Sequence, residues 1–186
     1  ITLSRNNFSC FPSGGPAQFA TAFAINMDHN RIRSIPVGIF SAAKSLTKLN
    51  LRDNEITALY PQDVATWVSL VELDMASNQL KMLPPEIEHL QQLEVLRLSY
   101  NCLRRLPTEI GKLKSLRVLD LEYNQLEFLP DSISSLDELQ DLNLISNRLT
   151  TLPRTMGLLA KLKMIKVGEN EIREIPPEIG LSRIEP

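Results

Sequence analysis

The chain repeats one pattern eight times, and each copy is a variant of Leu-x-x-Leu-x-Leu-x-x-Asn-x-Leu-x-x-Leu-Pro. The clearest marker is an asparagine that returns after 24 residues three times and then after 23 residues four times. The asparagines are Asn6, Asn30, Asn54, Asn78, Asn101, Asn124, Asn147 and Asn170. A constant period of this length predicts a stack of similar units without a single central core.

One copy shows what each position does. Leu96 and Leu98 alternate with Arg97, which predicts a short strand with one buried face. A single unit cannot bury its apolar positions alone, so each strand is expected to pair with the next in a parallel sheet. We therefore expect an α/β leucine-rich-repeat solenoid of about eight repeats. Its horseshoe has a concave parallel sheet and convex segments that are short helices or irregular.

The asparagine and a following proline mark the two ends of each turn. The asparagine amide can donate to and accept from backbone groups that a buried turn leaves unpaired. A proline follows six residues later in most copies, and we interpret Tyr60 as an insertion that delays it to Pro61. Proline fixes φ and marks the start of the convex segment. These prolines are Pro12, Pro36, Pro84, Pro107, Pro130, Pro153 and Pro176.

Residues 1–186 are expected to form one solenoid, as a piece of a longer one. The chain opens inside a strand at Ile1 and becomes irregular from Leu181. Without capping coils, both end faces should be exposed and prone to association, with Ile1 and Leu3 at one end and Ile179 and Ile184 at the other.

Composition excludes several classes of partner. A net charge of −2 and a pI near 5.8 give no basic field for nucleic acid. No apolar run approaches the roughly 18 residues that insertion into a membrane needs. The two cysteines, Cys10 and Cys102, lie four coils apart and should not bridge. Isolated thiols favour a reducing compartment, so we expect a cytoplasmic protein, with the nucleus as a second location.

No catalytic, cofactor or metal motif is present in the sequence. His29 and His89 fall on opposite faces of the predicted solenoid, so a shared metal ion is not expected. The sequence contains no phosphate-binding loop and no nucleophile motif, and Ser13-Gly14-Gly15-Pro16 is interpreted as an irregular convex loop. The sequence therefore predicts a protein that is not an enzyme and needs no cofactor.

The concave face offers charged and apolar side chains in columns. Arg97 is expected between Asp74 and Asp120 on neighbouring strands. One interpretation is a surface ion ladder worth about 0–1 kcal/mol per pair, and the other is an electrostatic match for a partner.

Tyrosines and valines occupy two further concave columns. Tyr100 and Tyr123 share one column, Val95 and Val118 share another, and Glu122 lies beside them. Rigid aromatic residues ringed by charges are typical of a binding hot spot. The alternative is that single exposed hydrophobic residues are ordinary on protein surfaces.

Several segments resemble the Shoc-two (Sur-eight) scaffold family, within the Ras group of intracellular leucine-rich repeats. They are residues 1–6, 12–19, 26–32, 38–41 and 46–50, with Trp67 and residues 71–73. The resemblance implies the C-terminal half of a non-catalytic scaffold of the Ras–Raf–MAP kinase pathway. Its partners would be a GTP-loaded Ras-type GTPase, the catalytic subunit of protein phosphatase one and Raf kinase.

The chain departs from that family in one respect. The family's phosphatase-docking motif, Arg-Val-x-Phe, precedes the family's repeats, and no such tetrapeptide occurs in this sequence. The nearest tetrapeptide, Arg117-Val118-Leu119-Asp120, lacks the aromatic residue. A second hypothesis, from another functional class, is the recognition domain of a larger leucine-rich-repeat enzyme or polarity scaffold. A third is a fragment that binds nothing.

Overall fold

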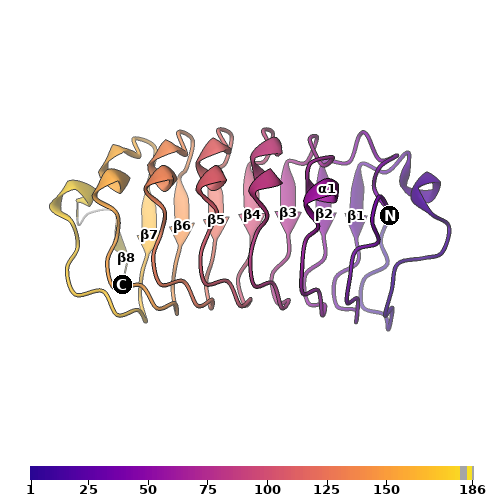
Figure 1. The fold of residues 1–186 in the computed structure, drawn as a ribbon, viewed down its shortest axis with the longest axis horizontal. Helices are drawn as coiled ribbons and strands as arrows, with labels where there is room; N and C mark the ends of the chain where they lie inside the picture. The colour runs from indigo at the N-terminus through magenta and orange to yellow at the C-terminus, as the bar shows by residue number, and fades with distance from the viewer. Residues whose placement is uncertain (181–183, 186) are drawn as a thin grey trace.

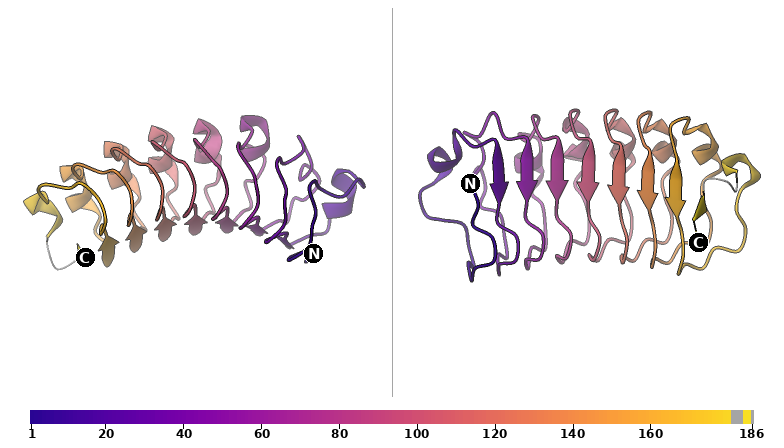
Figure 2. Two further views of the ribbon diagram at one scale, coloured as in Figure 1. Left: turned by 90° about the horizontal axis from the view of Figure 1, so that it is seen from below. Right: turned by 180° about the vertical axis from the view of Figure 1, so that it is seen from behind.

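The computed structural model describes residues 1–180 and 184–185, and these form a row of stacked coils (Figure 1) that is gently curved (Figure 2, left). We number the coils by their asparagine, from coil 1 with Asn6 to coil 8 with Asn170. In the described residues one parallel sheet holds eight strands in chain order. They are β1 (Ala24–Asn26), β2 (Lys48–Asn50), β3 (Glu72–Asp74), β4 (Val95–Arg97), β5 (Val118–Asp120), β6 (Asp141–Asn143), β7 (Met164–Lys166) and β8 (Ile184–Glu185). The predicted solenoid is confirmed.

The strands line the inside of the curve, and short helices lie on its outside (Figure 2, left). Each strand from β1 to β7 has a buried middle residue, such as Leu96 in β4, between two residues that face the concave side. Neighbouring strands pair in register, so Leu73, Leu96 and Leu119 stack in one buried column. The alternation along each strand therefore determines which of its side chains face the concave side.

The convex segments are mostly single turns of 3₁₀ helix. They are η1 (Pro16–Phe19), η2 (Pro85–His89), η3 (Thr108–Lys112), η4 (Asp131–Ser135), η5 (Arg154–Leu158) and η6 (Pro177–Ile179). Coil 3 instead carries a turn of α-helix, α1 (Pro61–Val64). No helix in residues 1–180 and 184–185 has the length and apolar character that crossing a membrane requires.

The interpretation of Tyr60 as an insertion is wrong. Tyr60 precedes α1 with φ −83° and ψ 130°, as Pro84 precedes η2 with φ −72° and ψ 150°, so the two residues occupy equivalent places. The extra residue of coil 3 lies within α1, where the N–H of Val64 bonds to the carbonyl of Tyr60, four residues back. An α turn holds one residue more than a 3₁₀ turn, so the longer repeat fits without a bulge.

The two ends of the stack differ. Ile1 is 50% exposed, whereas Ile179 is 2% exposed, so the expected exposure of Ile179 is wrong. The final turn is short, because Ile184 pairs with Ile165 19 residues earlier, and Gly180 has φ 74° where the chain turns. The irregular segment from Leu181 and the side chain of Ile184 lie outside the described residues.

Candidate functional site

The concave rim is held in place by the asparagine turns. The Nδ2 of Asn101 donates to the carbonyl oxygens of Leu98 in its own coil and Met75 in the preceding coil, each at 3.0 Å. Its Oδ1 accepts from the N–H of Leu80, also in the preceding coil, at 2.9 Å. The same pattern recurs from Asn30 to Asn170. Each asparagine thus joins its own coil to the one before it.

Asn6 lies in coil 1, and its amide bonds only within that coil. Its Nδ2 donates to the carbonyls of Leu3 and Ser4, and the residue is exposed. Asn6 therefore belongs to the same sequence column as the other asparagines without linking two coils.

The residue before each asparagine adopts the left-handed conformation. Its φ lies between 49° and 55° in all eight coils, although none of these residues is a glycine. They are Arg5, His29, Asp53, Ser77, Tyr100, Tyr123, Ser146 and Glu169. This conformation costs non-glycine residues roughly 1–2 kcal/mol, and hydrogen bonds to the next coil compensate for it. For example, the N–H of Tyr100 donates to the carbonyl of Glu122 at 2.8 Å.

The two tyrosines of this column form one aromatic surface. The rings of Tyr100 and Tyr123 stack with centroids 4.5 Å apart and planes 14° apart. Tyr100 is 48% exposed and Tyr123 is 44% exposed, so the pair is held by its own contact while remaining open to solvent. Partial desolvation, and then the Glu122 carboxylate, raise the pKa of the Tyr100 phenol. The phenol stays protonated at neutral pH and can donate a hydrogen bond to a ligand.

Arg97 lies between Asp74 and Asp120 in the sheet register, but it does not form the expected ladder with them. Its Nη1 donates instead to Oε1 of Glu72, diagonally across the sheet. The Nζ of Lys48 lies 3.5 Å from the other oxygen of Glu72. The hydrogen bond from Arg97 lowers the pKa of Glu72 most strongly. The long side chain of Arg97 reaches a residue two positions away from its in-register neighbour Asp74. The strand register alone does not predict this pairing.

The two aspartates beside Arg97 have other partners. Asp74 is 9% exposed and accepts a hydrogen bond from the N–H of Ala76 at 3.0 Å, while burial raises its pKa. Asp120 accepts from the N–H of Glu122 at 3.2 Å. The Glu122 carboxylate in turn accepts from Nδ2 of Asn143 at 3.0 Å. The carboxylates of coils 4 to 6 are therefore fixed in direction by neighbouring donors.

A hollow of about 310 Å³ lies beside these groups, lined by coils 5 to 8. Arg97 and Val118 lie on one side of it, and Asp141, Met164 and Lys166 lie on the other. Val118 and its neighbour Val95 in β4 are half-buried, so they present less surface than a fully exposed valine. Charged groups of both signs and apolar side chains thus line one depression beside the tyrosine column.

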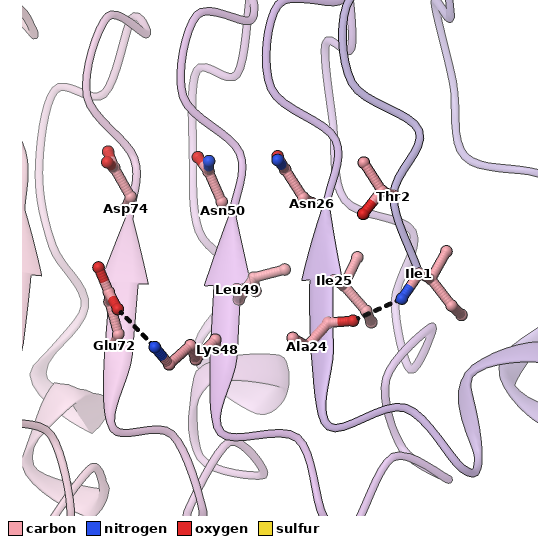
Figure 3. A pocket seen from close by; sticks show the side chains of 10 residues that line it. All are labelled: Ile1, Thr2, Ala24, Ile25, Asn26, Lys48, Leu49, Asn50, Glu72 and Asp74. Atoms are coloured by element: carbon pink, nitrogen blue, oxygen red, sulfur yellow. Dashed lines mark hydrogen bonds and ion pairs between the residues drawn. The ribbon is translucent and has the colours of Figure 1, made fainter.

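A second concave hollow was not predicted from the sequence. It has a volume of about 260 Å³ and lies over β1 to β3 (Figure 3). Its floor includes Thr2 and Ala24, whose side chains are shorter than those at the same columns in later coils. Figure 3 shows Asp74, Asn50 and Asn26 in a row beside it, with Lys48 reaching toward Glu72. The small residues Thr2 in coil 1 and Ala24 in coil 2 were the feature of the sequence from which this hollow could have been predicted.

The described residues give no support for a metal or disulfide site. In residues 1–180 and 184–185 no three His, Cys, Asp or Glu side chains gather as metal ligands would. His29 lies 3.1 Å from Asp28 and 3.5 Å from Asp53 on the rim, while Nδ1 of His89 contacts the carbonyl of Glu86 in a convex helix. Cys10 and Cys102 are both free thiols.

Comparison with known proteins agrees with the fold. A family model described as a leucine-rich repeat region matches residues 86–167, and one described as a leucine rich repeat matches residues 24–80. A leucine-rich repeat protein soc-2 homolog from Nematostella vectensis is 51% identical over 72 residues. That match covers 39% of this chain and 12% of the homolog.

Solved structures resemble most of the stack. A leucine-rich-repeat protein of Leptospira interrogans superposes with a TM-score of 0.78 at 31% identity, covering 88% of this chain and 46% of that one. The ectodomain of the Arabidopsis thaliana receptor kinase GASSHO1/SCHENGEN3, solved with CASPARIAN STRIP INTEGRITY FACTOR 2, gives 0.69 at 28% identity. That match covers 86% of this chain and 23% of the ectodomain, so the chain spans less than half of each of these proteins.

Proposed function

The chain belongs to the leucine-rich-repeat proteins, and we propose that it is a non-catalytic scaffold that binds protein partners on its concave face. The observation that carries this proposal is the stacked and exposed pair of Tyr100 and Tyr123 on a rigid rim. Aromatic anchors surrounded by polar residues supply most of the energy of protein interfaces. A surface already ordered before binding also loses little entropy when a partner docks.

The charges near the tyrosines fit the same role. Arg97 and Asp120 end their strands before the tyrosine turns, and Glu122 precedes Tyr123 directly. Val95 and Val118 pair at the start of the same strands and add an apolar contact beyond the charged row. The partner surface that complements this arrangement carries both charges and apolar groups, as protein surfaces do. A partner of this kind gains specificity from the fixed carboxylates and affinity from the aromatic pair.

The proposed partners follow from two similarities. The chain resembles the Shoc-two scaffold family, and 72 of its residues align with a soc-2 homolog at 51% identity. We propose that it assembles a GTP-loaded Ras-type GTPase with the catalytic subunit of protein phosphatase one. This assembly promotes Raf and MAP kinase signalling in the cytoplasm, with the nucleus as a second location.

A second function is favoured by a different observation. The ectodomain whose fold this chain shares belongs to a plant membrane receptor kinase and was solved in complex with CASPARIAN STRIP INTEGRITY FACTOR 2. The same surface could serve as the recognition domain of a leucine-rich-repeat enzyme or polarity scaffold. The full-length gene separates the two proposals, because a catalytic or PDZ domain in the same chain supports only the second.

Binding to purified partners tests the first proposal. Tyr100→Ala combined with Tyr123→Ala removes both anchors, at about 2 kcal/mol or more for each truncated hot spot. Capture of the GTP-loaded GTPase or the phosphatase subunit should be lost, while thermal unfolding changes little. The convex control, Glu88→Ala with Lys112→Ala, should bind as the unaltered chain does. Wild-type affinity in the tyrosine variant together with loss in the convex variant would place the partner on the outer face.

A further inference from the structure

A further hollow in the described residues does not lie on the concave face. It measures about 570 Å³ and spans coils 3 to 6 on the outer flank. This flank consists of the segments that rise from the asparagine turns to the row of short helices, across the near side of Figure 1. It is separate from the tyrosine pair and from both concave hollows.

The hollow is lined mostly by apolar side chains and is rich in proline. Met82 in coil 4 and Phe128 in coil 6 border it, and they are 56% and 52% exposed. Its walls contain five prolines, which are Pro61, Pro84, Pro85, Pro107 and Pro130. Proline has no N–H that would need a hydrogen-bond partner, and its fixed φ keeps the wall ordered before binding. Exposed hydrophobic residues gathered in a preformed hollow are typical of an interaction site.

One charged side chain in this hollow has no ion-pair partner in the part of the chain that the structure describes. Arg105 lies in coil 5, at the repeat position that Met82 occupies in coil 4 and Phe128 in coil 6. Among the described residues Arg105 makes no ion pair, and the carboxylate that also lines the hollow, Glu109, accepts a hydrogen bond from Thr108 at 3.1 Å. Covering a guanidinium with apolar contacts costs free energy unless a carboxylate reaches it. The flank therefore presents an apolar, a cationic and an apolar group in a row.

The spacing of this row fits a helix. Equivalent positions of neighbouring strands lie about 4.8 Å apart in a sheet, and the coils spread on the outer side of the curve (Figure 2, left). The pitch of an α-helix is about 5.4 Å, and residues separated by three or four positions lie on one face. Alternate residues of an extended strand are instead about 6.6–6.8 Å apart. The turns of a helix that lies across the coils therefore match the spacing of the coils, whereas the alternate residues of an extended strand are spaced too widely.

We propose that the flank hollow binds an amphipathic helix of a partner protein. On one face this helix carries an acidic residue between two apolar residues, each about one helical turn away from it. The carboxylate pairs with Arg105, and the two apolar side chains contact Met82 and Phe128. This surface is additional to the concave face. One chain can therefore hold two partners at once, one inside the curve and one on the flank.

A library of helical peptides tests the proposal with a defined probe. Three positions, i, i+4 and i+7, are randomised in an otherwise helix-favouring, soluble sequence, and peptides that bind the immobilised chain are selected. We expect enrichment of apolar, acidic and apolar residues in that order. The charge-reversed variant Arg105→Glu should enrich a basic residue at i+4. By fluorescence anisotropy each peptide should bind its matched chain about tenfold or more tightly than the mismatched one, as expected for a hydrogen bond to a charged group.

Two control variants locate the bound peptide. Phe128→Ser should abolish the enrichment, whereas Tyr100→Ala with Tyr123→Ala should leave it unchanged because those residues lie on the concave rim. Failure to enrich any peptide, equal binding of acidic and basic peptides, or loss only in the tyrosine variant overturns the proposal. Self-association of the unaltered chain that Phe128→Ser abolishes also overturns it, since the occupant is then a second copy. None of these results depends on whether the GTPase or phosphatase binds.

Discussion

Tyr100 and Tyr123 stack at 4.5 Å while both hold the left-handed backbone conformation, with φ of 55° and 49°. Bulky residues rarely adopt this conformation. Two neighbouring coils thus carry tyrosine at a position where glycine suits the backbone better. The stacking of the two rings on the rim is the favourable contact that these tyrosines gain. The turn itself does not require tyrosine, because other coils place residues such as Ser77 and Glu169 at the same position. The stacked pair therefore fits the proposed interaction surface.

Comparing glycine with alanine at Tyr100 measures the backbone cost. Both substitutions remove the stacked ring, but only Tyr100→Gly relieves the left-handed strain. We expect Tyr100→Gly to be more stable than Tyr100→Ala by about 1 kcal/mol in urea unfolding. At the exposed Arg104, which lacks a positive φ, alanine should be the more stable substitution. The same order at both positions contradicts the strain assignment.

Asn101→Ala should destabilise the chain by about 1–3 kcal/mol, because it leaves buried backbone groups of two coils unpaired. Asn6 provides a matched control of the same residue type in the same column. Asn6→Ala removes only contacts within an exposed first coil and should cost less than about 0.5 kcal/mol. Unfolding midpoints in denaturant decide between them, and equal midpoints would show that the links between coils contribute nothing.

Asp74 and Glu72 should give opposite pH dependences of stability. Burial raises the pKa of Asp74 above its ordinary 3.8, so its ionised form opposes folding and the free energy of unfolding falls as pH rises through that range. Asp74→Asn removes this fall and should be neutral or slightly stabilising at pH 7. Asn26, Asn50 and Asn143 accept the same backbone hydrogen bond in the same column.

Glu72 behaves in the reverse sense. Arg97 lowers its pKa below the ordinary 4.5, so Glu72 contributes stability above that value and loses it as pH falls through the lower, folded-state pKa. Glu72→Gln should cost about 0–1 kcal/mol at pH 7, since the pair is only partly buried, and nothing in strong acid. Thermal unfolding of Asp74→Asn, Glu72→Gln and the unaltered chain from acid to neutral pH tests these two opposite changes of stability with pH. Parallel profiles for the two variants contradict them.

Gly111→Ala should destabilise the contact between η3 and η4. A Cβ at Gly111 lies 2.3 Å from the backbone oxygen of Ser132, so the two convex turns have to move apart. Such overpacking typically costs about 1–3 kcal/mol. Glu88 occupies the same repeat position in coil 4, and Glu88→Ala should be close to neutral. Thermal melts of the two variants provide the comparison, and an unchanged melt for Gly111→Ala contradicts the close approach.

The sequence predicted the features that depend on periodicity. Leu96 and Leu98 fixed the buried face of their strand, and the position of Asn101 fixed the turn. The column containing Tyr100 and Tyr123 followed from counting back from the asparagines. Each of these inferences needed only the repeat length and the alternation of a strand.

Features that depend on side-chain reach or on turn type were not predicted. Arg97 selects Glu72 over Asp74 and Asp120 because a long side chain can cross to a diagonal neighbour. Tyr60 looked like an insertion because the spacing of the prolines does not show whether a convex segment forms an α turn or a 3₁₀ turn. The flank hollow was missed because Met82, Arg105 and Phe128 share a position whose residue type varies from coil to coil.

The asparagine links also bear on how such a chain can change its length. Across every junction from coils 1 and 2 to coils 7 and 8, side-chain amides reach back to the earlier coil. Backbone N–H groups such as that of Tyr100 donate forward to the later one. A duplication or deletion of one whole repeat therefore restores these asparagine and backbone hydrogen bonds at the new junction. The same event moves the tyrosine rim and the flank row by one coil relative to other features, so recognition can shift while folding is preserved.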